Sequence, residues 1–123
     1  MAARWETLML NKRREVAQEL ANRLIAAEHA IDAALTAIAD LSGYMPVARC
    51  EAKLSAVIGN GALESAAETF SSLVRARRNI IDTHHHLAEA KDQIGLRAFA
   101  LGGLDLKAEH NTGGLSIVKS DAA

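Results

Sequence analysis

The feature that most constrains the fold is the stretch over residues 4–41, which contains neither glycine nor proline. Good helix formers fill it, and its apolar residues recur every three or four positions, as Leu24, Ile31 and Ile38 do. This spacing predicts a helix with one apolar face. Such a helix is at least about 50 Å long, whereas a compact chain of this size has a radius of gyration of about 14 Å. The molecule must therefore be elongated.

Glycine and proline mark the ends of the predicted elements. The Ser-Gly pair at residues 42–43 predicts the end of the first helix, because glycine suits the left-handed position after a helix. Pro46 then suits the first position of a short helix over residues 46–58. The Gly-Asn-Gly triplet at residues 59–61 ends this short helix, and its asparagine is a candidate cap for the next one.

A third helix is predicted over residues 62–94, because Gly95 and the leucine after it form a helix-ending pattern. If Gly95 does not end it, this helix extends over residues 62–101. Residues 1–101 would then form one helical-hairpin domain, and residues 102–123, with a second glycine pair, a flexible tail.

These elements define an all-α fold, an elongated antiparallel hairpin of two long helices plus a short connecting helix. Alanine, glutamate, lysine, leucine and arginine make up about half of the chain, a composition typical of long helices. Two alanine-rich helices bury little apolar surface against each other. We therefore expect a second copy to complete a four-helix bundle, which makes the protein a homodimer.

The faces that meet in the hairpin can be assigned from the heptad spacing of the apolar residues. In an antiparallel hairpin with Leu41 opposite Glu64, Glu28 faces Arg77, and we interpret this as a register-setting ion pair. The alternative is that both side chains extend independently to solvent. The predicted seam consists of Leu24, Ile31, Ile38, Phe70, Leu73, Ile80, His84, Leu87 and Ile94.

Three consecutive histidines, residues 84–86, suggest a metal site, but neighbours on a helix point about 100° apart and cannot close on one ion. A spacing of three or four residues suits joint ligation better. It relates Asp82, His85, His86 and Glu89, with His29 and Asp32 of a second subunit as further candidates. A metal-binding helical bundle is therefore one alternative function. A solvated polar face explains the same residues, and we expect neither a metal nor another cofactor.

Two basic clusters, Lys12-Arg13-Arg14 and Arg75 with Arg77 and Arg78, raise polyanion or nucleic-acid binding as a weaker alternative. The net charge is −1, and aromatic residues that could stack on bases are scarce. Nucleic acid is therefore not an expected partner.

No catalytic constellation is present in the sequence. It contains no glycine-rich phosphate loop, and Cys50 has no histidine placed near it by the sequence. The longest uncharged stretch, residues 54–63, is too short to span a bilayer, and the first ten residues lack the apolar core of a secretory signal. We expect a cytoplasmic, non-enzymatic protein, and the high alanine and arginine usage suits a bacterial source.

The leading functional hypothesis is a helical protein that self-associates and acts through protein–protein contacts, as a scaffold, adaptor or small regulator. Its contact surface would be the helical seam. The β-prone run in the tail, with Leu115, Ile117 and Val118, is a second candidate contact, because such segments add to sheet edges of other proteins.

Overall fold

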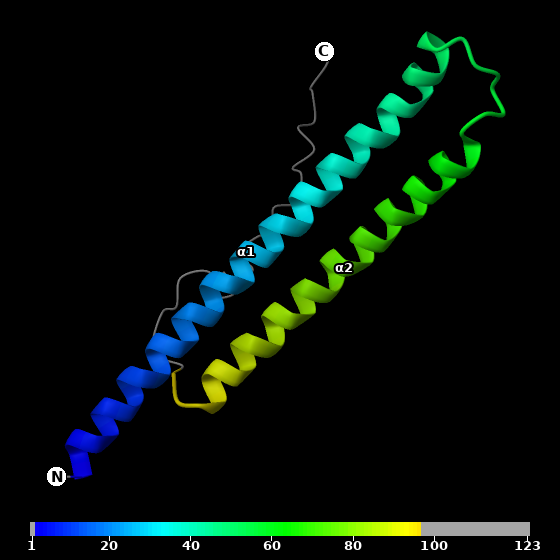
Figure 1. Cartoon of the computed structure of the whole chain (residues 1–123). Coiled ribbons are helices and arrows are strands. Elements are labelled where there is room, and N and C mark those ends of the chain that lie inside the picture. Colours follow the sequence, from blue (N-terminus) through cyan, green and yellow to red (C-terminus); the bar gives the residue numbers. More distant parts are fainter. Residues whose placement is uncertain (1, 97–123) are drawn as a thin grey trace, which may run out of the picture.

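A computed structural model describes residues 2–96, which form two helices, α1 (Ala2–Glu51) and α2 (Asn60–Gln93). The helices run antiparallel, side by side, as one long hairpin joined by a loop (Figure 1). The described residues contain no strand. The predicted all-α hairpin is therefore confirmed at this level.

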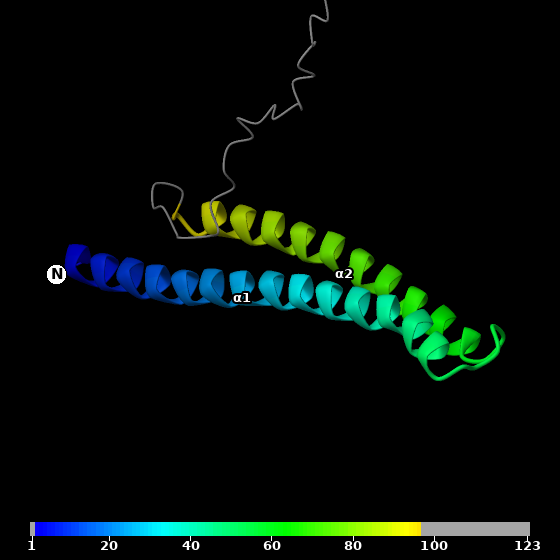
Figure 2. The same ribbon diagram turned by 90° about the horizontal axis from the view of Figure 1, so that it is seen from above.

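The first helix does not end where the sequence predicted. α1 continues through Gly43 and Pro46 to Glu51, so the break at residues 42–43 and the separate short helix over residues 46–58 are wrong. The Ser42 hydroxyl donates to the carbonyl of Ile38 (2.7 Å) within the helix, and nothing lies within 4 Å of a Cβ built on Gly43. Pro46 removes one backbone donor, yet the helix continues past it and curves toward the loop (Figure 2).

The end of α1 is set by Lys53, which adopts a left-handed conformation (φ 56°) that a non-glycine residue rarely takes. Its N–H donates to the carbonyl of Cys50 (3.1 Å), and the N–H of Leu54 donates to the carbonyl of Arg49 (3.0 Å). This pair of bonds is the Schellman arrangement that satisfies the last carbonyls of a helix. The loop therefore occupies residues 52–59 rather than beginning near residue 42.

Both ends of α2 involve a glycine with positive φ. Gly59 (φ 85°) precedes its first residue, Asn60, and no side chain caps this end, so the expected asparagine cap is absent. At the other end Gly95 has a φ of 83°, in agreement with the helix end predicted for residues 62–94. The N–H of Leu96 donates to the carbonyl of Lys91 (3.0 Å). The longer alternative over residues 62–101 and the tail at residues 102–123 lie outside the described residues.

Within the described residues the core of the hairpin is small and lies near its open end. Ala17, Ala21, Leu24 and Leu96 form one buried cluster. Leu10, Ile80 and Leu87 pack against this cluster, and Ala66 is buried near the loop end. Neither described helix contains a segment apolar enough, over sufficient length, to cross a membrane. The small size of the core leaves most large apolar side chains on the surface.

Candidate functional site

The seam between the helices follows the predicted faces. Leu24 is buried, and six other predicted members are half-buried: Ile31, Ile38, Leu73, Ile80, His84 and Leu87. Phe70 and Ile94 remain exposed. The heptad spacing therefore identifies the facing sides of the helices, although it does not identify which residues stand opposite each other.

Among the described residues, Glu28 with His84 and Asp32 with Arg77 form polar pairs across the seam, and neither is the predicted pair. His84 Nδ1 lies 3.0 Å from Glu28 Oε1, and Arg77 Nε donates to Asp32 Oδ1 at 2.8 Å. Glu28 thus pairs with His84, two helical turns beyond the predicted Arg77. Arg77 pairs with Asp32, one helical turn beyond the predicted Glu28. The cause is the longer α1, because the midpoint of the observed loop, residues 52–59, lies three residues beyond that of the predicted corner, residues 42–63.

The histidine–carboxylate candidates do not assemble into a cluster in the described residues. His86 Nδ1 lies 3.7 Å from Glu89 Oε2, and both side chains are largely exposed. Within residues 2–96 no group of three or more His, Cys, Asp or Glu side chains is arranged to hold a metal ion. Asp32, a ligand candidate from the second subunit, bonds to Arg77 instead. Metal binding through Asp82, His85, His86 and Glu89 stays an alternative hypothesis.

Several members of the basic clusters have neighbours within the hairpin. Lys12 lies 3.7 Å from Glu15, and Arg13 donates to the carbonyl of Ile94 at 3.5 Å. The Arg75 guanidinium donates to the hydroxyls of two serines one turn before it. These contacts tie the arginines to their own helices or to the helix end opposite, and none of them marks a site for a polyanion.

A second apolar stripe runs along α1, beside the face that packs on α2. Leu20 and Ala21 are consecutive, so their side chains point about 100° apart, one to the side and one into the seam. This side stripe repeats every three or four residues, and its one charged member, Arg23, bonds to Glu19 (2.9 Å). Its members are Val16, Leu20, Arg23, Ala27, Ala30, Ala34, Ala37, Leu41, Tyr44 and Ala48. Its large apolar members are each about half exposed.

The N-terminal part of α1 projects beyond the end of α2 (Figure 1). The contact of Arg13 with the carbonyl of Ile94 marks the level at which α2 ends, so residues 2–12 form an overhang with no second helix beside it in the described chain. Trp5 is 68% exposed there. Met9 lines one shallow hollow together with Val16 and Leu20, so the overhang and the side stripe form one continuous apolar surface.

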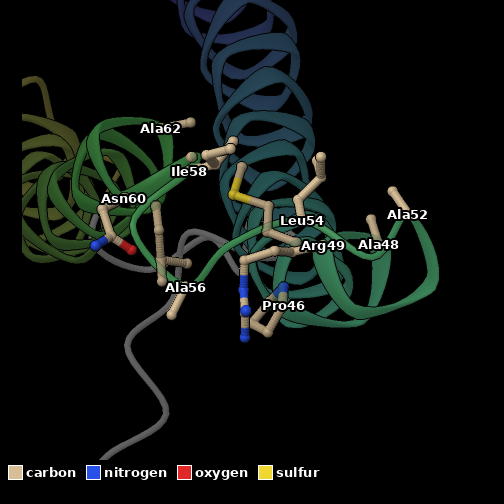
Figure 3. A pocket seen from close by; sticks show the side chains of 12 residues that line it. Pro46, Ala48, Arg49, Ala52, Leu54, Ala56, Ile58, Asn60 and Ala62 are labelled. Atoms are coloured by element: carbon tan, nitrogen blue, oxygen red, sulfur yellow. The ribbon is translucent and has the colours of Figure 1, made fainter.

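An apolar pocket lies at the other end of the hairpin, between the end of α1, the loop and the start of α2 (Figure 3). Its volume is about 510 Å³, within the range of small-molecule and side-chain binding pockets. Among the described residues Arg49 is the one ionisable group in its lining. The lining comprises Met45, Pro46, Ala48, Arg49, Ala52, Leu54, Ala56, Ile58, Gly59, Asn60, Ala62 and Leu63.

The sequence pattern did not predict this loop-end pocket. The short helix expected over residues 46–58 would have placed Leu54 and Ile58 on a regular helical face. The signal that was available is the dense apolar content of residues 54–58 directly before a Gly-Asn-Gly triplet. In the structure these residues form the loop wall of the pocket. The tail residues Leu115, Ile117 and Val118 lie outside the described part of the chain.

Comparison of the chain with protein-family models, with curated proteins and with solved structures found no match. The exposed apolar surfaces, and the chemistry of the side chains that form them, are therefore the features from which a function can be inferred.

Proposed function

We propose that the chain is a non-enzymatic helical protein that self-associates and acts through protein–protein contacts, as a scaffold, adaptor or small regulator. The observation that carries the proposal is the imbalance between buried and exposed apolar residues. In the described chain the hairpin buries little beyond three alanines and two leucines, Leu24 and Leu96. Large side chains such as Trp5, Leu20 and Leu41 stay exposed along its length. A continuous apolar surface of this kind favours association.

The side chains that line the loop-end pocket support a non-enzymatic role. General acid–base catalysis needs a positioned proton donor or acceptor whose pKa suits the reaction. Arg49 is the one ionisable group among the described lining residues, and a guanidinium offers hydrogen-bond donors but no acceptor. The chemistry of the pocket suits burial of an apolar side chain better than turnover of a substrate.

Sedimentation velocity of the full chain from low to high micromolar concentration tests the proposal. We expect a dimer that dissociates on dilution, because the exposed apolar side chains gain burial only in an assembly. A monomer throughout this range would contradict self-association. Static light scattering on the same samples gives the mass independently of molecular shape, which matters for a molecule this elongated.

A further inference from the structure

We infer that the occupant of the side stripe is a second copy of this chain, packed with its α1 antiparallel to the first. In this arrangement Trp5 and Met9, from the overhang of each copy (residues 2–12), lie against the loop-end pocket of the other. The inference rests on the proposed self-association and specifies the surfaces that perform it. Three features of the described residues support it, namely the order of residues along the side stripe, the positions of overhang and pocket, and the available area.

The order of large and small residues along the side stripe suits a two-fold contact. Val16 and Leu20 form its N-terminal end, Leu41 and Tyr44 form its C-terminal end, and Arg23 and four alanines lie between them. In a two-fold interface the same patch meets itself in reverse, so each residue contacts the one that lies at the same distance on the other side of the axis. A reversal about Ala30 brings the Leu20 end of one copy to the Leu41 end of the other. The alanines allow the two helices to approach closely in the middle.

The same reversal brings the overhang to the loop-end pocket. A two-fold axis near Ala30 places Trp5 and Met9 of one copy at the level of residues 48–59 of the other, which include much of the pocket wall. Trp5 supplies a large apolar side chain with no helix packed beside it in the described chain, and the pocket supplies an apolar cavity. An unrelated partner is not expected to fit both the overhang and the loop-end pocket at the same time.

The surface available suffices for a stable dimer. The side stripe from Val16 to Tyr44 is about 42 Å long at about 1.5 Å per residue, and two adjacent helices are together about 20 Å wide. This gives about 800 Å² per copy, the area that each partner contributes to an interface of standard size. On the matching side of α2 the residues other than His86 are small or short, and none carries an acidic or lysine side chain that would obstruct the approach. They are Ala62, Ser65, Thr69, Ser72, Ala76, Asn79, Thr83, His86 and Ala90.

Trp5 is the one tryptophan of the chain, so its fluorescence reports directly on the overhang. In the isolated hairpin it is exposed and should emit at the long wavelength typical of indole in water. We expect the emission maximum to move to shorter wavelength as concentration rises, in parallel with dimer formation measured by sedimentation. Ile58→Glu, which puts a carboxylate into the pocket, should weaken the dimer about tenfold or more and reduce the shift. Val57→Glu is the matched control, since this exposed neighbour does not line the pocket.

A disulfide cross-link tests the position of the axis. In a Cys50→Ser background, Ala30→Cys should form a disulfide-linked dimer under mild oxidation, because a residue near a two-fold axis meets its own copy. His29→Cys, whose side chain points about 100° away, should not.

A dimer that shows neither the Trp5 shift nor the cross-link of the Ala30→Cys variant would overturn this interface and leave self-association standing. A protein that stays monomeric would overturn both proposals. A short-wavelength Trp5 emission that persists in the monomer would show that the chain itself covers the overhang, and would overturn the assignment to a second copy.

Discussion

The two polar pairs across the seam differ in exposure, and their contributions to stability should differ accordingly. The side chains of His84 and Glu28 are 19% and 31% exposed, whereas those of Arg77 and Asp32 are both more than half exposed. A partly buried hydrogen bond contributes about 1 kcal/mol to the free energy of unfolding, and an exposed ion pair about 0.5 kcal/mol or less. We therefore expect a double-mutant cycle of Glu28→Ala and His84→Ala to give a coupling energy of about 1 kcal/mol in urea unfolding. The Asp32→Ala and Arg77→Ala cycle should give about half of that or less.

A third cycle, Glu28→Ala with Arg77→Ala, distinguishes the observed register from the one that the sequence predicted. In the structure these residues bond to different partners, so their effects should add to within about 0.3–0.5 kcal/mol. A coupling as large as that of Glu28 with His84 would support the predicted register and contradict the observed one.

At the scale of the elements, two glycines should respond to alanine with opposite signs. Gly43 is inside α1 with open space around a built Cβ, so Gly43→Ala should raise the free energy of unfolding by about 0.5–1 kcal/mol, the usual helix-interior difference. Gly95 has φ +83°, where a Cβ is strained, so Gly95→Ala should lower it by about 1–2 kcal/mol. Thermal unfolding followed by circular dichroism measures both. If α1 ended at Gly43, as the Ser-Gly pair predicted, Gly43→Ala would destabilise the protein instead.

These glycines also show how far local sequence rules reach. The rule that glycine followed by leucine ends a helix predicted the end of α2 correctly, because the conformation at Gly95 satisfies the last carbonyls locally. The expectation that a glycine ends the helix failed at Gly43. A single glycine inside a long run of helix formers lowers helix stability by only about 1 kcal/mol, which is less than the loss from ending the helix there. The end of α1 depends on Lys53, a residue type that carries no stop signal. No propensity rule would have selected it.

At the scale of the whole molecule, the position of the turn decides where the candidate sites lie. The predicted hairpin reversed direction over residues 42–63, and the predicted pairing of Glu28 with Arg77 depended on that turn. The longer α1 moves the loop to residues 52–59, so α2 ends opposite Arg13 and leaves residues 2–12 as an overhang. The same shift turns Leu54 and Ile58 into a pocket wall. The expectation of a partner could be drawn from the sequence, because it depends on the apolar content of the chain. The surfaces that would contact the partner depend on the position at which α1 ends, which the sequence pattern did not predict.

The shape of the dimer follows from the place of the two-fold axis. α1 has 50 residues and is about 75 Å long at about 1.5 Å per residue, and an axis near Ala30 lies close to its middle. Two copies then overlap along nearly their whole length. Small-angle X-ray scattering should accordingly show a cross-section that grows on dimerisation, while the length of the helical rod stays about 75–90 Å. Copies that joined end to end would form a rod of about 150 Å with an unchanged cross-section, a result incompatible with antiparallel packing of α1 on α1.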